Sequence, residues 1–144
     1  MNCAIFGHHV AGEEVKPLLK EAILYLVQDK HIRNFLVGNN GNFDFYAQCV
    51  LQELKPEGVN INFSIVLSHI EESSLSKNQN ETIFPEELEN AIPRLAIFKR
   101  NEWIIKKSSF LIAYAKNKFS NSQKWIERAR KKGVQIINIA DRSV

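Results

Sequence analysis

The sequence of 144 residues lacks the features that mark several large classes of protein. It contains no run of about 18 apolar residues, which a membrane-spanning helix requires, and the start MNCAIFGHH lacks the basic-then-apolar layout of a secretory signal. Its two cysteines, Cys3 and Cys49, both lie in apolar stretches, and no CxxC or HxxxH spacing occurs. This pattern indicates buried thiols and predicts neither a disulfide nor a metal site. We therefore expect a cytoplasmic protein without membrane contact, metal or cofactor.

Acidic residues are scarce in the last third of the chain. Residues 99–144 hold 12 Lys and Arg against 3 Asp and Glu, whereas residues 1–98 hold 7 against 13. A basic segment of this kind can bind nucleic acid, a phosphorylated small molecule or the acidic part of the same fold. Much of it reads KWIERARKK, the pattern of a solvent-exposed helix face, and the basic strands with interleaved aromatic residues of single-strand binders are missing. The pattern therefore does not favour nucleic acid as the partner.

Short apolar runs alternate with stretches of helical periodicity along the chain. The runs predict five strands, at residues 3–6, 35–37, 60–67, 110–114 and 134–139. Ser120 with Gln123 three residues later has the form of a capping box and marks the start of the last helix. Residues 68–92 include a polar stretch without period and predict a long loop. Strands that alternate with helices predict an α/β, Rossmann-like three-layer fold with a parallel sheet of about five strands, in a single domain over residues 1–144.

The loops that follow the strands are the places where we expect a ligand, because open parallel sheets bind ligands outside the carboxyl ends of their strands. The loop after the second strand reads GNNGN, in which glycines allow a close backbone approach and asparagines both donate and accept hydrogen bonds. A strand-to-helix corner with Asn42 as helix N-cap would use the same residue types for structural reasons alone. The predicted ligand-binding residues are Gly7, His8, His9, Gly38, Asn39, Asn40, Gly41, Asp44, Arg100, Asn101, Ser120 and Ser122.

Asp44 and Arg100 are the charged residues of this predicted site. Asp44 falls in the first turn of a helix, where a carboxylate suits the helix dipole, and it is also the candidate for a ribose contact or for a catalytic acid or base. Arg100 can bind a phosphate, or it can form a salt bridge with the glutamates of residues 86–89. Trp103 and Trp125 fall at helical positions, which we interpret as packing positions.

Five segments of the sequence are similar, in order and spacing, to one known family: AIFGHHV, FLVGNNGNFDFY, ETIFP, RLAIFKRNEWIIKKSSFLIAYAKN and GVQIINI. They resemble the SLOG-like Rossmannoid proteins, which are small bacterial and phage-encoded proteins related to the Lonely Guy phosphoribohydrolases and to DprA-type domains. The resemblance covers nearly the whole chain and is weakest over residues 70–80. It implies a protein that binds or processes a nucleotide-derived ligand, including the ADP-ribose-like signals of antiviral defence.

Three departures from the family pattern bear on activity. The first loop carries His9 where the family has Arg, and Ser108-Ser109 stands where the family often has Ser-Asp. The phosphoribohydrolases have a PGGxGT turn and a catalytic Glu after the fourth strand, where residues 116–123 here read KNKFSNSQ. Cleavage of an N-glycosidic bond needs a carboxylate, whereas Ser120-Asn121-Ser122 at a helix start can still hold a phosphate. The departures therefore affect catalysis more than binding.

The sequence predicts a protein that binds a nucleotide-derived small molecule, an ADP-ribose-like or cyclic nucleotide signal. We expect a homo-oligomer, which would act through its assembly or by sequestering this signal, as phage anti-defence proteins do. Two alternatives stay open. The first is a nucleotide N-glycosidase or phosphoribohydrolase that uses Asp44, Glu81, Glu86 or Glu87 as its carboxylate. The absence of the PGGxGT turn and its catalytic Glu makes an enzyme the less favoured interpretation. The second is a basic interaction module for an acidic partner.

Overall fold

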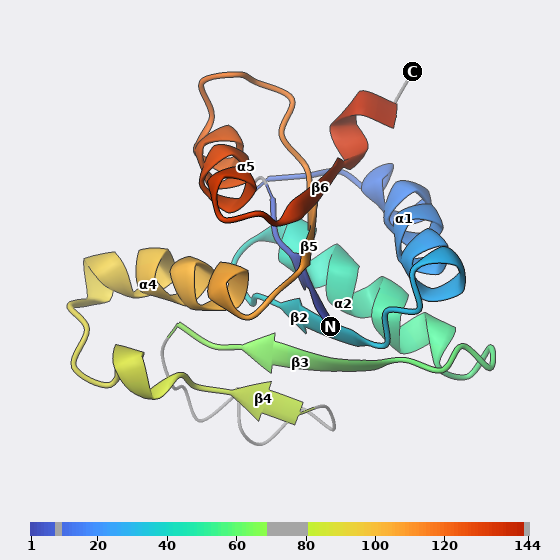
Figure 1. The fold of residues 1–144 in the computed structure, drawn as a ribbon, viewed down its shortest axis with the longest axis horizontal. Coiled ribbons are helices and arrows are strands. Elements are labelled where there is room, and N and C mark those ends of the chain that lie inside the picture. Colours follow the sequence, from blue (N-terminus) through green and yellow to red (C-terminus); the bar gives the residue numbers. More distant parts are fainter. Residues whose placement is uncertain (8–9, 69–80, 143–144) are drawn as a thin grey trace.

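The computed structural model describes residues 1–7, 10–68 and 81–142, in which strands and helices alternate (Figure 1). In chain order the elements are β1 (Asn2–Ile5), α1 (Val15–Asp29), β2 (Asn34–Val37), α2 (Asn42–Leu54), β3 (Asn62–Val66), β4 (Glu81–Ile83), the 3-10 helix η1 (Glu86–Leu88), α4 (Pro93–Lys106), β5 (Phe110–Ala113), α5 (Asn121–Lys131), β6 (Gln135–Asn138) and the 3-10 helix η2 (Ile139–Arg142). Among the described residues, no helix is long and apolar enough to cross a membrane.

Among the described residues, the sheet has six parallel strands in the order β4-β3-β2-β1-β5-β6, which confirms the predicted α/β architecture. The strand beyond the predicted five is β4, which lies with η1 inside the stretch that the sequence predicts to be a loop. It pairs with β3 at one edge of the sheet, where Ser64 stands opposite Glu81 and Val66 opposite Ile83. A strand of three residues has too few alternating positions to show a period, so its pairing with β3 rather than its local sequence defines it.

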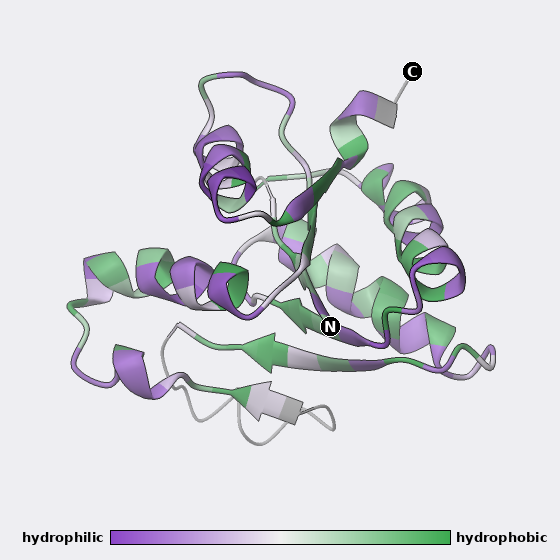
Figure 2. Ribbon diagram, viewed as in Figure 1, coloured by the Kyte–Doolittle hydropathy of each residue, from purple (hydrophilic) through white to green (hydrophobic). Residues whose placement is uncertain are grey.

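Two layers of helices enclose the sheet, with α1 and α2 over one face and α4 and α5 over the other (Figure 1). Successive residues of a strand point to opposite faces, so Cys3 and Ile5 pack in the core under α1 and α2, while Ala4 and Leu111 pack under α4 and α5. Because both faces are covered, the central strands are apolar without interruption. Figure 2 shows hydrophobic residues in the central strands and alternating hydrophobic and hydrophilic residues along the helices.

The direction in which strands are added to the sheet reverses beside β1. The chain moves from β1 through β2 and β3 to β4 at the edge, and α4 then returns it to β5 on the other side of β1. A reversal of this kind leaves a crevice outside the carboxyl ends of the strands, where ligands bind in open α/β sheets. The segments that follow β1 and β2 and the helices α4 and α5 are therefore in position to form a site.

Ser120 caps the start of α5, as the sequence pattern predicts. Its Oγ accepts a hydrogen bond from the backbone N–H of Gln123 at 3.1 Å. The side-chain amide of Gln123 donates to Glu127 at 3.0 Å, one turn further along the helix. The cap therefore satisfies one of the N–H groups that a helix leaves without an intrahelical partner at its first turn.

Replacement of Ser120 by alanine should lower the free energy of unfolding by about 1 kcal/mol, because the N–H of Gln123 loses its acceptor. Ser120→Asp should keep the stability of the wild type, since a carboxylate also caps and suits the positive end of the helix dipole. Chemical denaturation of the three proteins measures both effects. An alanine variant as stable as the wild type would show that this cap contributes nothing to α5.

Candidate functional site

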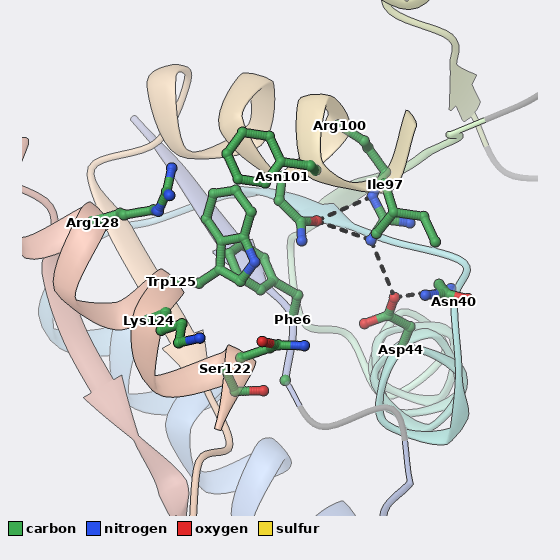
Figure 3. A pocket seen from close by; sticks show the side chains of 13 residues that line it. Phe6, Asn40, Asp44, Ile97, Arg100, Asn101, Ser122, Lys124, Trp125 and Arg128 are labelled. Carbon is green, nitrogen blue, oxygen red and sulfur yellow. Dashed lines mark hydrogen bonds and ion pairs between the residues drawn. The ribbon is translucent and has the colours of Figure 1, made fainter. Parts of the chain in front are cut away.

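A cavity of about 480 Å³ lies in the crevice beside β1, between α4 and α5 (Figure 3). Sites for small molecules commonly measure about 300–1,000 Å³, so the cavity is large enough for one ligand of that class. Residues after β1, residues of the β2–α2 corner and one face each of α4 and α5 line it. The lining residues are Phe6, Gly7, Asn40, Asp44, Ile97, Phe98, Arg100, Asn101, Asn121, Ser122, Lys124, Trp125 and Arg128.

The GNNGN turn owes its shape to Gly41, the N-cap residue of α2, whose φ of 93° lies in the region that favours glycine. The sequence suggested Asn42 as this N-cap, and that interpretation is wrong, because Asn42 is the first residue of the helix and its side-chain amide donates to the carbonyl of Ala11 at 3.4 Å. Asp44 stabilises the turn instead, since its Oδ2 accepts from the backbone N–H of Asn40 at 3.0 Å. The turn therefore has a structural role in addition to its place beside the cavity.

Asp44 and Arg100 form a buried pair in the wall of the cavity. Each residue is only 2% exposed, and the Arg100 Nη2 atom lies 3.9 Å from Asp44 Oδ2. Burial lowers the pKa of the Arg100 guanidinium from its ordinary value, and the charge of Asp44 opposes this shift. Arg100 thus pairs with Asp44 and not, as one sequence interpretation had it, with the glutamates of residues 86–89.

Two asparagines of the described residues also accept hydrogen bonds from the Arg100 guanidinium. The Asn101 side-chain oxygen accepts from Nε at 3.3 Å and from Nη2 at 2.9 Å, and the Asn39 side-chain oxygen accepts from Nη1 at 3.3 Å. Gly38 leaves the space for this cluster, because a Cβ atom at that position would lie 2.5 Å from Asp44 Oδ2 and 2.9 Å from Arg100 Cζ. The guanidinium is therefore held in one orientation by groups from three segments of the chain.

The face of α5 that borders the cavity is polar at one end and aromatic at the other. Asn121, Lys124, Trp125 and Arg128 follow the i, i+3, i+4, i+7 spacing of one helix face, and all four line the cavity. The Arg128 guanidinium lies over the ring of Phe98 at 4.7 Å and over that of Trp125 at 5.1 Å, measured to the ring centroids. This face combines two positive charges with aromatic surface, beside the start of α5.

Half of the twelve residues that the sequence predicts to bind a ligand line the cavity, namely Gly7, Asn40, Asp44, Arg100, Asn101 and Ser122. Four others support the structure around it: Gly38 makes room for the Arg100 cluster, Asn39 accepts from Arg100, Gly41 caps α2 and Ser120 caps α5. His8 and His9 lie outside the described residues. The alternative carboxylates Glu86 and Glu87 are exposed on η1, and the side chain of Glu81 is outside what the structure describes.

Sequence reasoning placed Ser122 of α5 at the site but missed three further side chains of this helix, Lys124, Trp125 and Arg128. Trp125 was interpreted as a packing residue, and it does pack, with ring centroids 6.2 Å from Phe6 and 4.9 Å from Phe98. The available signal was the polar and aromatic stripe that begins one residue after the Ser120 cap. A stripe of this composition also fits a solvent-exposed helix face. It lines a cavity only because α4 lies opposite.

Metal chemistry finds no support in the described residues, where no group of three or more His, Cys, Asp or Glu side chains could hold a metal ion. The cavity instead offers cations, amides, a hydroxyl and aromatic rings. Such groups bind an anionic ligand that also has a flat or apolar part.

Comparison with known proteins shows the fold and leaves the ligand open. No protein-family model matches the chain, and no curated protein matches it significantly. Its structure is similar to the X-ray structure of DNA processing protein A (DprA) from Streptococcus pneumoniae, with a TM-score of 0.58 and 10% sequence identity over 97% of this chain. The chain spans 59% of the length of that DprA chain. The protein is therefore an α/β protein with the Rossmann-like fold that DprA also has.

Replacement of Asp44 by asparagine should lower the free energy of unfolding by about 3 kcal/mol, because it leaves the buried Arg100 charge without its counter-ion. The asparagine oxygen can still accept from Asn40, so the variant tests the ion pair more than the turn. The double variant Asp44→Asn/Arg100→Met should recover part of the loss, since it removes both charges. Urea denaturation of Asp44→Asn, Arg100→Met and the double variant measures the coupling. A double-variant loss equal to the sum of the two single losses would contradict a stabilising pair.

Proposed function

We propose that this protein binds a nucleotide-derived small molecule in the cavity between α4 and α5. The observation that carries the proposal is the combination, in one cavity at the strand reversal, of Lys124 and Arg128 with the aromatic rings of Phe98 and Trp125. The charges suit a phosphate, and the rings suit a nucleobase or the apolar face of a ribose. Asp44, the acid among the described lining residues, is paired with Arg100 and so repels such an anion less than an unpaired carboxylate would.

The similarity of the sequence to SLOG-like proteins supports the same class of ligand, ADP-ribose-like compounds or cyclic nucleotides. The proposed role is sequestration of such a signal by a homo-oligomer, as in phage anti-defence. In this role the protein holds its ligand intact, so the role requires a cavity that binds the ligand tightly and requires no catalytic group.

The contacts of Asp44, the carboxylate in the cavity wall, favour binding of the ligand over its hydrolysis. Asp44 Oδ2 is engaged by the N–H of Asn40 and by Arg100, and both contacts stabilise a negative charge on it. A carboxylate held in this way is poorly suited to donate a proton to a leaving base, and its pairing with Arg100 offsets the negative charge that would stabilise a cationic transition state. Glu86 and Glu87 are exposed on η1 and do not line the cavity.

The test is isothermal titration calorimetry with a panel of AMP, ADP-ribose, cyclic ADP-ribose isomers and cyclic dinucleotides. Replacement of Arg128 by alanine should weaken the best ligand at least about tenfold, because a charge-assisted hydrogen bond to phosphate is lost. Arg130→Ala is the matched control: it removes the same residue type from the same helix, outside the cavity, where Arg130 pairs with Glu127 on the surface. Equal losses in the two variants would contradict a site at Arg128.

Product analysis in the same samples distinguishes a binder from an N-glycosidase. Recovery of the ligand unchanged after denaturation of the protein supports sequestration. Release of a base or of ribose phosphate that stops in Asp44→Asn, in a sample that circular dichroism shows to be folded, would instead establish a hydrolase with Asp44 as the catalytic carboxylate.

Salt dependence addresses the remaining alternative, a basic module for an acidic partner. Binding of a nucleotide in an aromatic-lined cavity should weaken only modestly with added salt, whereas binding of a polyanion through several lysines should fall steeply. Titrations at about 50 mM and 200 mM salt separate these two behaviours, since each released counter-ion adds to the slope.

A further inference from the structure

A second, smaller hollow of about 180 Å³ adjoins the cavity. Trp125 and Arg128 line both spaces, so these two side chains form the boundary between them. The other lining residues of the hollow are Glu102, Ile105, Lys131 and Lys132. Contacts with Phe98 and Trp125 hold the Arg128 guanidinium at this boundary, at the end of the cavity away from Asp44 (Figure 3).

The hollow repeats the chemistry of the cavity on a smaller scale. Trp125 and the buried Ile105 give it an apolar wall, and it carries three cations, Arg128, Lys131 and Lys132, against one carboxylate, Glu102. The positive charge along this face of α5 thus continues beyond the cavity. A nucleoside monophosphate carries at most about two negative charges, which Lys124 and Arg128 already balance. It would leave the lysines of the hollow unused.

We propose that the ligand has two parts joined through phosphate, one part in the cavity and the other in the hollow, with the linking phosphate at Arg128. The ligand class is therefore a nucleotide in which two nucleoside or sugar units are connected by a phosphodiester or a pyrophosphate. This inference rests on the proposed function and makes it more specific. Arg128 is the bridging contact because, among the described residues, it is the cation that borders both spaces.

Calorimetry on matched ligand pairs tests the proposal. Each nucleoside monophosphate (AMP, GMP, CMP, UMP) is compared with the corresponding linear dinucleotide (pApA, pGpG, pCpC, pUpU), and ADP-ribose represents the pyrophosphate-linked class. The better two-part ligand should bind at least about tenfold more tightly than the matching monophosphate, because it adds contacts at the same site.

Two variants of the hollow should change the affinity ratio between the two-part ligand and the monophosphate in opposite directions. Lys131→Ala/Lys132→Ala should abolish the tenfold gain and leave monophosphate binding within about twofold of wild type, since both lysines lie outside the cavity. Glu102→Gln should strengthen two-part ligands about twofold to fivefold by removing the acid of the hollow. The control Lys118→Ala/Arg130→Ala removes the same total charge from a different hollow, which both residues line. It should keep the tenfold tighter binding of the two-part ligand.

The outcomes separate this inference from the proposed function. Suppose that monophosphate binding depends on Arg128. If two-part ligands then bind no more tightly than monophosphates, or if their tighter binding survives Lys131→Ala/Lys132→Ala, the inference is wrong and the proposed function stands. Equal loss of the gain in the control double variant also overturns it, because the effect would then be general electrostatic attraction. If no nucleotide of the panel binds, both are wrong.

Discussion

The contact between Asp44 and Arg100 joins the two helical layers past the ends of the strands. Asp44 belongs to α2, on one side of the sheet, and Arg100 belongs to α4, on the other. Two charges withdrawn from water are stable only while both are present and well bonded, and Asn39 and Asn101 supply the remaining acceptors for the guanidinium. The pair therefore fixes α4 against the β2–α2 corner. The same two side chains form part of the cavity wall and hold the two helical layers together. Any ligand that binds there meets a preorganised surface.

The crossover through α4 decides that this surface is basic. It carries the chain from the acidic segment around η1, at the edge of the sheet, back to β5 beside β1. The basic last third of the sequence is thereby placed over the crevice and not at the periphery. Phe98 and Trp125 then hold the Arg128 guanidinium over their rings, which reduces the side-chain entropy that capture of an anion would otherwise remove. The same helix face continues into the hollow beyond Trp125, so one row of side chains serves both spaces.

Most of the fold was predictable because the signals that define it are local. Apolar runs such as 110–114 are short enough for strands buried on both faces of a parallel sheet, whereas the stripe of residues 43–54 is long enough for a helix with one buried side. The strand β4 was not predictable, because three residues at an edge carry no period and depend on the pairing with β3. The N-cap of α2 was assigned one residue too late, since Asn42 is the better side-chain cap while the backbone of the turn requires glycine at position 41.

The sequence by itself determined the class of the fold, the edge of the sheet at which the cavity lies, and the loops and helix starts that reach it. These follow from residue periodicity and from the rule that parallel strands end together. Only the tertiary structure decided which partners meet there. Asp44 and Arg100 are separated by more than fifty residues, and Arg128 faces Phe98 only because α4 and α5 cover the same side of the sheet. Contacts between residues so distant in the chain depend on how the elements pack, which no local pattern records.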